Sequence, residues 1–353
     1  MKRNNVSFSE AINDALNIAM KKNKNVIVLG LGVDDPKRTF GTTKNLKEKY
    51  GNNRVFDMPT AENAMTGFAI GASLNGYIPI ISHQRVEFSL LAIEQIINQA
   101  AKWNYMYAGK LSVPMVIRLI IGRGWGQGAQ HSQSLETIFA HIPGLKVVTP
   151  ATPKDAKGLL LTSIEDKNPV IFFEHRWLHQ TIGNFPKKYF KIPLGKAKKI
   201  TKGKDLTIIS YSLMTTEVIK TIEILKKYKI YPDLIDLRSI RPLDKETILN
   251  SVKKTKRLLV VDNGWMNFGV SSEIISIVSE NLSNSLKCKP VRIGINNSPI
   301  PSTRALAKYC YPGTNEILKS VLKMFNKKIK KNDLKHYKLE KTDIPNKSFT
   351  GPF

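Results

Sequence analysis

The stretch that decides the fold reads Asp57-Met-Pro-Thr-Ala-Glu62-Asn-Ala-Met-Thr-Gly-Phe-Ala-Ile-Gly71. The apolar run Val55 to Met58 is typical of a short strand, and the segment Asn63 to Leu74 carries apolar residues at helical spacing. Short apolar runs alternate with longer amphipathic segments along the rest of the chain as well. The sequence therefore predicts an α/β fold with two doubly wound domains, each a mostly parallel sheet with helices on both faces.

The predicted elements fall into two series. The first has strands at Val26 to Leu31, Val55 to Met58, Ile78 to Ser82, Met115 to Ile121, Lys146 to Thr149 and Val170 to Glu174, and helices at Ser9 to Lys22, Asn63 to Leu74, Ser89 to Tyr107 and Lys154 to Asp166. The second has strands near Leu206 to Ser210, Leu234 to Leu237, Leu258 to Val261 and Val291 to Ile293, and helices near Thr216 to Tyr228, Lys245 to Val252 and Ser271 to Leu282.

Between the two series the chain has Gly-, Pro- and Lys-containing sequence without a clear period, which is typical of an interdomain connection. We predict a first domain over 1–185, a linker over 186–204 and a second domain over 205–325. A basic tail follows over 326–353. Its charge favours a solvated segment, and its apolar ending leaves a docking segment as an alternative.

Composition excludes several classes of protein. The 353 residues carry a formal charge of +27, but the lysines are spread along the chain and do not alternate with aromatic residues, so we predict no nucleic-acid partner. The 2 cysteines, Cys288 and Cys310, give neither a disulfide framework nor a metal-ligand spacing. No apolar run is long enough to cross a bilayer, and the N-terminus does not resemble a signal peptide. We therefore expect a soluble, cytoplasmic protein.

Glu62 stands in the first turn of the helix quoted above. The helix dipole favours a negative side chain at this place, which is reason enough for an isolated glutamate. Behind it, however, lies a stripe of small residues that includes Gly67 and Gly71, and such a stripe lets another backbone or a flat ligand approach closely. Glu62 is therefore a candidate for acid-base chemistry in a crowded site.

His131 lies in the glycine-rich run that begins at Gly122, after the strand Met115 to Ile121. The run fits neither the dinucleotide fingerprint nor the Walker spacing, so we do not predict a phosphate loop. A histidine on a loop after a parallel strand is well placed for acid-base work or for holding a substrate carboxylate, and a structural role is the alternative. Phe88 begins a predicted helix and alone would be a core residue. The remaining histidines have no metal-ligand spacing to each other.

Together with further segments, these residues resemble one known family. The segments are Pro59-Thr-Ala-Glu62, Phe88 with Ala92-Ile-Glu-Gln-Ile-Ile-Asn98, Gln130-His-Ser-Gln-Ser134, Pro143-Gly-Leu-Lys-Val-Val148, Asp155-Ala-Lys-Gly-Leu-Leu160, Asp166-Lys-Asn-Pro169, Ile235-Asp-Leu-Arg-Ser-Ile-Arg-Pro-Leu-Asp244 and Val260-Val-Asp-Asn-Gly-Trp265. They are similar to the β subunit of heterotetrameric thiamin-diphosphate-dependent 2-oxo acid dehydrogenases, the decarboxylating component of the pyruvate, branched-chain and acetoin systems. The resemblance implies a pyrimidine-binding domain followed by a domain like the C-terminal domain of transketolase.

The resemblance also implies a role for each matched residue. Glu62 matches the glutamate that hydrogen-bonds the pyrimidine nitrogen of thiamin diphosphate and thereby activates it. Phe88 matches the aromatic residue that stacks on the aminopyrimidine. His131 matches the histidine that handles the substrate carboxylate and the acyl-transfer step.

An absence is equally informative, since the family anchors the diphosphate and Mg²⁺ with a Gly-Asp-Gly motif and this chain has none. The resemblance therefore implies an α subunit that carries the Mg²⁺ ligands, an α2β2 assembly, a 2-oxo acid substrate and a lipoyl transacylase as acyl acceptor. A K⁺ site known in relatives maps to Val113, Met115, Val116, Ser163, Asp166 and Asn168.

Two departures from the family pattern lie near the expected pocket. Where many relatives have an acidic residue after the third strand, this chain reads Ser82-His-Gln-Arg-Val-Glu-Phe, which brings His83 and Arg85 close to the site. Arg123 and Trp125 also differ from the family's loops, and Arg123 could pair with a further anionic group. These departures leave the 2-oxo acid open.

Two other functions remain as alternatives. One is a split transketolase-like or carboligating thiamin enzyme that transfers a two-carbon or acyl unit to an aldehyde. The other is a non-catalytic binding or scaffold subunit, against which the presence of Glu62, Phe88 and His131 argues.

Overall fold

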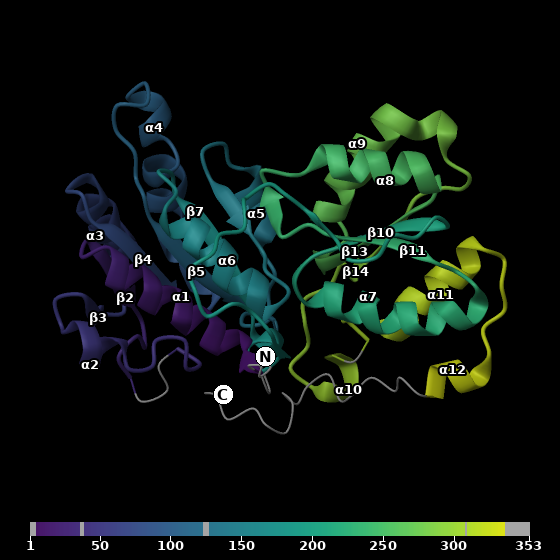
Figure 1. Cartoon of the computed structure of the whole chain (residues 1–353), viewed down its shortest axis with the longest axis horizontal. Helices are drawn as coiled ribbons and strands as arrows, with labels where there is room; N and C mark the ends of the chain where they lie inside the picture. Colours follow the sequence, from purple (N-terminus) through teal and green to yellow (C-terminus); the bar gives the residue numbers. More distant parts are fainter. Residues whose placement is uncertain (1–4, 36–38, 123–126, 308, 336–353) are drawn as a thin grey trace.

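Two α/β domains lie side by side in this computed structural model, which describes residues 5–35, 39–122, 127–307 and 309–335 (Figure 1). Both predicted sheets are present. Among the described residues, no helix is long and apolar enough to cross a membrane.

The first domain is built on a seven-stranded sheet whose strands are parallel except at one edge. In spatial order the strands are β12 (Ser239–Arg241), β6 (Lys146–Val148), β7 (Val170–His175), β5 (Val116–Ile121), β4 (Ile78–His83), β2 (Val26–Gly30) and β3 (Val55–Asp57). Helices α1 (Phe8–Lys22) and α6 (Pro153–Ile164) cover one face, where Val28 and Ile80 point. Helix α3 (Glu62–Leu74) and the 3-10 helix η1 (Val86–Ala92) cover the other face, where Leu29 and Ile81 point.

Capping residues explain where the two outer helices begin. Ser7 caps α1 by accepting a hydrogen bond from the N–H of Glu10 at 3.2 Å, while its own N–H donates to Oε2 of Glu10 at 2.7 Å. Thr152 caps α6 by accepting a hydrogen bond from the N–H of Asp155 at 3.2 Å, with Pro153 as the first helical residue. A two-stranded ribbon of β1 (Val6–Ser7) and β8 (Ile182–Gly183) ties the start of α1 to the end of the domain.

The second domain has a five-stranded sheet. Its order is β14 (Val291–Ile295), β13 (Leu258–Trp265), β10 (Leu206–Ser210), β11 (Pro232–Asp236) and β9 (Lys198–Lys199), and only β9 is antiparallel. Helices α8 (Lys245–Thr255) and α9 (Val270–Leu282) pack together on one side, and α7 (Ser212–Leu225) and α11 (Thr314–Met324) pack together on the other (Figure 1).

Short elements complete the two domains. They are α2 (Leu46–Tyr50), the π-helical turn η2 (Gln95–Ala100), α4 (Trp103–Met106), α5 (Glu136–His141), η3 (Arg176–Leu178), η4 (Lys226–Tyr228), η5 (Ser283–Ser285), α10 (Arg304–Ala307) and α12 (Lys331–Lys335).

The chain crosses between the domains more than once. Residues 186–204, predicted as a linker, include β9, which pairs with β11 in the second sheet. After β11 the chain returns to the first domain, where β12 pairs antiparallel with β6. The start of the predicted tail is held as well, because Asp333 accepts hydrogen bonds from the Tyr228 hydroxyl at 2.7 Å and from Lys227 at 3.0 Å. The rest of the tail lies outside the described residues.

One predicted helix was wrong as a single element. The segment Ser89 to Tyr107 is divided into η1, η2 and α4. The first part, the 3-10 helix η1, stays in contact with both β4 and β5. The wider π-helical turn then takes up an extra residue before α4.

A charged cluster lies inside the first sheet, which periodicity did not predict. Nε of Arg118 on β5 donates to Glu174 on β7 at 2.5 Å, and its other nitrogens donate to Ser82 on β4 at 3.2 Å and to Thr42 at 2.8 Å. His179 lies 3.1 Å from the same carboxylate. Burial alone would raise the pKa of Glu174, but the Arg118 charge and these hydrogen bonds hold it at about 2.

Removing one partner of this pair should destabilise the domain strongly. We expect Glu174→Ala to lower the free energy of unfolding by about 3–5 kcal/mol, because Arg118 would stay buried without its counter-charge. Urea denaturation followed by circular dichroism measures the change. As a control, Glu165→Ala removes the partner of the exposed Lys22 and should have a small effect. Equal losses in the two variants would contradict the assignment.

Candidate functional site

The three candidate residues follow three parallel strands of the first sheet. Glu62 is the first residue of α3, after β3; Phe88 lies in η1, after β4; and His131 follows β5. The carboxyl ends of parallel strands share one edge of a sheet, which is the usual place for a ligand in such folds. The structure brings Phe88 and His131 together with ring centroids 5.4 Å apart and a tilt of 36°. Helix α3, which begins with Glu62, packs against η1.

Glu62 has an unusual environment for a carboxylate. Its side chain is buried, with 4% exposure. Its backbone carbonyl accepts a hydrogen bond from Thr66 at 2.8 Å, but within the described part of the chain no group donates to its carboxylate. The position therefore fits a ligand that brings its own hydrogen-bond donor, as an aminopyrimidine would.

His131 and Phe88 leave functional atoms available in the same way. Nδ1 of His131 is buried and has no hydrogen-bond partner among the described residues. Phe88 is only half-buried, so part of its ring remains open to a ligand. An aminopyrimidine could stack on the Phe88 ring and donate to the Glu62 carboxylate. An anionic substrate could accept a hydrogen bond from the His131 imidazole.

His83, at the end of β4, and Arg85, which follows it, also lie near the site. His83 is completely buried, with Nε2 3.5 Å from the Thr66 hydroxyl, and burial lowers its pKa to about 4, so this histidine is neutral near pH 7. Arg85 donates to the carbonyl of Gly122 at 2.5 Å. Gly122 has a φ of +90°, and a Cβ there would come within 2.6 Å of the His175 ring, so only glycine fits where β5 ends. Arg123 and Trp125 lie outside the described residues.

The second domain reaches this site through Asn263, which the sequence did not reveal and which also donates to the Ser134 hydroxyl at 3.4 Å. Asn263 on β13 donates to Glu136 at 3.1 Å, and Glu136 begins α5, shortly after His131. The next residue, Gly264, allows the backbone of Ser134 to lie against it. The segment Val260 to Trp265 was noticed for its resemblance, but no role for Asn263 could be predicted without knowing which loop it faces.

The residues predicted for K⁺ lie at the start of β5, in the last turn of α6 and in the turn before β7. The N–H of Val170 donates to the carbonyl of Met115 at 3.0 Å, and the N–H of Asp166 donates to Ser163 at 3.3 Å. The Asp166 carboxylate accepts from the Asn168 N–H at 2.9 Å and also pairs with Lys146. Ser163, Asp166 and Asn168 are therefore neighbours, and the charge of Lys146 lies beside the Asp166 carboxylate.

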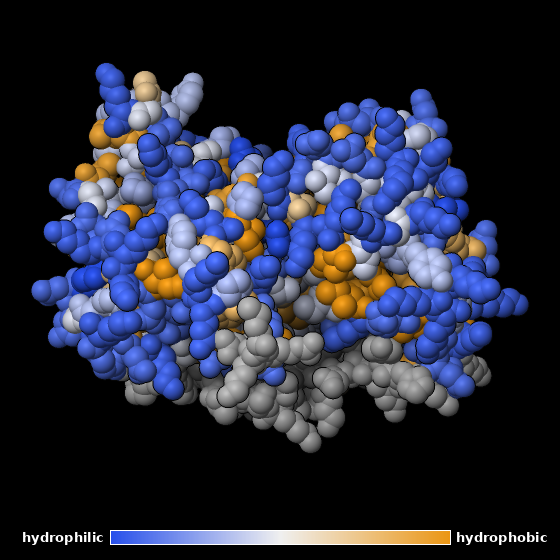
Figure 2. Space-filling model, in the orientation of Figure 1, coloured by the Kyte–Doolittle hydropathy of each residue, from blue (hydrophilic) through white to orange (hydrophobic). Residues whose placement is uncertain are grey.

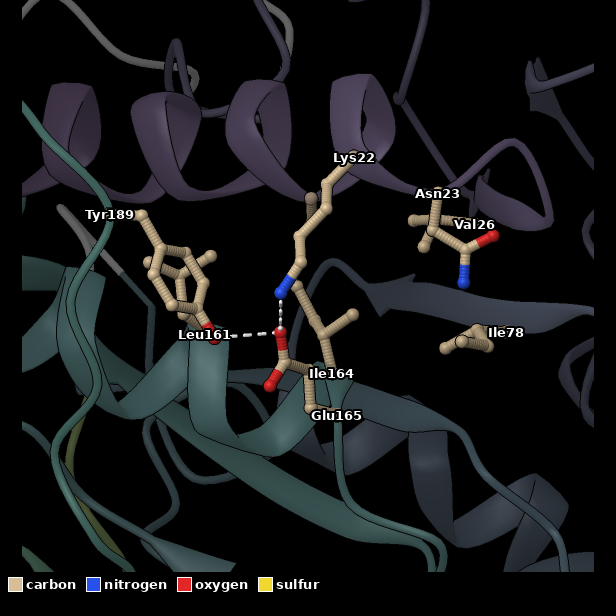
Figure 3. A pocket seen from close by; sticks show the side chains of 9 residues that line it. Lys22, Asn23, Val26, Ile78, Leu161, Ile164, Glu165 and Tyr189 are labelled. Carbon is tan, nitrogen blue, oxygen red and sulfur yellow. Dashed lines mark hydrogen bonds and ion pairs between the residues drawn. The ribbon is translucent and has the colours of Figure 1, made fainter.

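A cavity of about 300 Å³ lies elsewhere, between α1 and α6 (Figure 3). Its rim holds Glu165, which accepts hydrogen bonds from Lys22 at 2.8 Å and from the Tyr189 hydroxyl at 2.7 Å. Because α1 and α6 cover the face opposite α3, this cavity is separated from Glu62 by the sheet. It has no part in the site.

No group of three or more His, Cys, Asp or Glu side chains that could hold a metal ion occurs among the residues that the structure places.

The surface around the site is not uniformly polar. Figure 2 shows hydrophilic residues over most of this face, with apolar residues among them at the upper left, around α4. Phe68 on α3, Leu91 on η1 and Tyr105 on α4 are 48%, 65% and 89% exposed. Exposed apolar side chains on adjacent elements are typical of a surface that another protein covers.

Comparisons with known proteins identify the two domains and similar proteins. The transketolase pyrimidine-binding domain matches residues 4–180, and the transketolase C-terminal domain matches residues 195–317. The pyruvate dehydrogenase E1 component subunit beta of Acholeplasma laidlawii is 38% identical over 320 residues, 90% of this chain and 98% of that protein. The acetoin:2,6-dichlorophenolindophenol oxidoreductase subunit beta of Cupriavidus necator is 38% identical over 322 residues, 88% of this chain and 95% of that protein.

A solved structure gives the same fold. The structure titled "Split gene transketolase, inactive beta4 tetramer" matches with a TM-score of 0.73 and 22% identity, and it covers 92% of this chain and 99% of that one.

The contact between the domains should depend on pH. Burial raises the pKa of Glu136 to about 7, from an ordinary value of 4.5. Between pH 4.5 and pH 7 the folded chain keeps a proton that the unfolded chain releases. The free energy of unfolding therefore falls as the pH rises through this range, and it does not recover above pH 7. Glutamine is neutral at every pH. We therefore expect the free energy of unfolding of Glu136→Gln, relative to that of the wild type, to be about 2–3 kcal/mol higher at pH 8 than at pH 5.

Thermal denaturation at the two pH values measures this difference. Glu165→Gln serves as the control, because hydrogen bonds from Lys22, Tyr189 and Lys191 outweigh burial and hold the pKa of Glu165 at about 2. A Glu136→Gln effect that is the same at pH 5 and pH 8 would show that the Glu136 carboxyl is already charged at pH 5.

Proposed function

The chain belongs to the family of β subunits of thiamin-diphosphate-dependent E1 components, such as those of pyruvate and acetoin dehydrogenase, and on this premise we propose how it acts. Glu62, Phe88 and His131 form the half of an active site that activates the cofactor and handles a 2-oxo acid. One observation carries the proposal: the buried Glu62, whose carboxylate has no donor among the described residues, lies on the helix packed against η1. Phe88 on η1 faces a histidine whose Nδ1 has no partner among those same residues.

Each residue has a physical task in this half-site. Thiamin diphosphate, when bound, supplies the nucleophilic carbon for attack on the 2-oxo group. Glu62 shares a proton with the pyrimidine ring nitrogen, and its burial strengthens that hydrogen bond. Phe88 offers its ring to the aminopyrimidine and excludes water from it. His131, whose Nδ1 has no protein partner within the described residues, binds the substrate carboxylate and moves a proton during acyl transfer.

The other half of the site belongs to an α partner in this proposal. The chain has no Gly-Asp-Gly motif, so the diphosphate and its Mg²⁺ are held by the α subunit of an α2β2 assembly. The exposed Phe68, Leu91 and Tyr105 lie on the elements that carry or adjoin Glu62 and Phe88. This apolar surface supports a partner that covers the site. The acyl group then passes to a lipoyl group on a transacylase.

The central experiment is reconstitution of the chain with its proposed α partner. CO₂ release is measured with a panel of 2-oxo acids, first with 2,6-dichlorophenolindophenol as electron acceptor and then with aldehydes. Release coupled to dye reduction supports the dehydrogenase. Carboligation to aldehydes alone would replace it with the split transketolase-like alternative. Absence of thiamin binding in the assembled complex would leave the non-catalytic subunit.

Removal of the Glu62 carboxylate should abolish cofactor activation without disturbing assembly. We expect Glu62→Ala to slow exchange of the thiazolium C2 proton for deuterium at least about 100-fold, because the pyrimidine loses its proton partner. Proton NMR of the acid-quenched complex measures the exchange, and size-exclusion chromatography monitors assembly. Glu165→Ala, on the opposite face, is the control. Wild-type exchange in Glu62→Ala would overturn the role of Glu62.

We also propose that K⁺ binds at the oxygens of Val113, Met115, Val116, Ser163, Asp166 and Asn168. If so, the melting temperature of the complex should be higher in KCl than in NaCl at equal ionic strength, since binding to the folded state alone stabilises it. The difference should disappear in Asp166→Ala. Equal melting temperatures of the wild type in the two salts would exclude the site and leave Lys146 as the only cation beside Asp166.

A further inference from the structure

A buried ion pair connects the sheet to the segment that carries His131. Nε of Arg85 lies 3.5 Å from Oε2 of Glu87, and each side chain is only 7% exposed. Arg85 immediately precedes η1, and Glu87 lies in its first turn. Burial lowers the pKa of Arg85 from its ordinary value, and the charge of Glu87 opposes that shift.

Each partner of the pair holds a different part of the site. Arg85 donates to the carbonyl of Gly122 at 2.5 Å, where β5 ends, and this bond attaches it to the rigid sheet. Glu87 accepts the backbone N–H of Gln133 at 3.0 Å, two residues after His131. The contacts therefore run from the sheet through Arg85 and Glu87 to the backbone beside His131.

The same element carries the residue that His131 faces. Phe88 follows Glu87 directly, and its ring centroid lies 5.4 Å from that of His131. The backbone of η1 thus fixes one member of the ring pair, and the carboxylate of Glu87 fixes the other. A displacement of either contact would change how His131 meets a ligand stacked on Phe88.

Stability alone is a poor explanation for this pair. Burying two charges costs desolvation free energy that their attraction often fails to recover. A buried ion pair is therefore weak evidence for stability, and its role can be to hold other groups in place. Here the geometry of the pair matches that task, because both hydrogen bonds leave the pair in the direction of backbone atoms on either side of the His131 segment.

We propose that Arg85 and Glu87 are positioning residues that set the orientation of His131 against Phe88. This inference rests on the proposed function for the part that concerns turnover, since it assumes that His131 acts on the substrate. Neither residue needs to touch the substrate. The pair affects the substrate through the backbone of Gln133. Loss of the contact between Glu87 and Gln133 should misplace His131 without changing the position of Glu62.

The variants separate positioning from folding. Glu87→Ala removes the acceptor for Gln133, whereas Glu87→Gln removes the charge and keeps an oxygen that can accept the bond. Asp244→Ala is the matched control: Asp244 is also buried and accepts backbone N–H bonds, from Ala197 at 3.0 Å and Thr247 at 3.1 Å, but in the second domain. All are measured in the complex with the α partner.

Amide hydrogen exchange gives a readout that does not depend on turnover. In Glu87→Ala, the peptide covering residues 127–135 should exchange at least about ten times faster than in the wild type, because Gln133 loses its acceptor. Glu87→Gln should stay near the wild-type rate, and Asp244→Ala should leave this peptide unchanged. Equal exchange in Glu87→Ala and the wild type would overturn the proposal.

Kinetics test the consequence for catalysis. With the 2-oxo acid that the wild type turns over fastest, chosen from pyruvate, 2-oxobutyrate and 3-methyl-2-oxobutanoate, Glu87→Ala should lower kcat/KM about 10- to 100-fold. Exchange of the cofactor C2 proton should remain at the wild-type rate. In a His131→Ala background, Glu87→Ala should have little further effect on kcat/KM, because the group that it positions is gone.

The outcomes distinguish this inference from the proposed function. If the effects of Glu87→Ala and His131→Ala on kcat/KM multiply, Glu87 acts independently of His131 and the positioning role is wrong. If C2 exchange falls together with turnover, the variant disturbs the whole site and the role is also wrong. A wild-type complex that turns over no 2-oxo acid contradicts the proposed function instead, and hydrogen exchange at Gln133 then decides the positioning contact alone.

Discussion

The Arg118–Glu174 pair is the contact on which the first domain depends. It lies within the central strands of the first sheet, and Arg118 also reaches Ser82 on β4 and Thr42. A charge buried this deeply is tolerated only when its counter-charge and hydrogen bonds are in place. The pair therefore fixes the lateral alignment of β4, β5 and β7. The segments that carry Phe88 and His131 follow β4 and β5, so the positions of these two residues depend on the alignment of the strands.

The half-site is assembled from strand ends and not from a single motif. Each candidate residue lies on a different connection, and a separate device holds it: the first turn of α3 for Glu62, the 3-10 turns of η1 for Phe88, and the contacts of Glu87 and Asn263 for the segment around His131. The half-site therefore draws on both domains. Apolar side chains remain exposed beside it, which is the arrangement expected when a second protein completes the pocket.

Much of the fold could be predicted from sequence, because long apolar strands and amphipathic helices have a clear period. The alternation confirmed the α/β class and the two sheets. Strands such as β9 and β12 have too few residues to show a period, and their partners lie far away in sequence. Helix α11 was missed although Ile317, Leu318 and Val321 are spaced for it. Arg118 within Val116–Ile121 was a visible irregularity, but nothing local identifies Glu174 as its partner.

The return of the chain to form β12 also constrains how the protein folds during synthesis. Strand β12 follows β9, β10, α7, η4 and β11 of the second domain in sequence, yet it completes the edge of the first sheet beside β6. As the chain leaves the ribosome, domains ordinarily fold one after another from the N-terminus. Here the edge of β6 stays without its neighbour until Arg241 has emerged. During that interval β6 is an open edge that another nascent chain could pair with, so this part of the sheet is where a chaperone would be most useful.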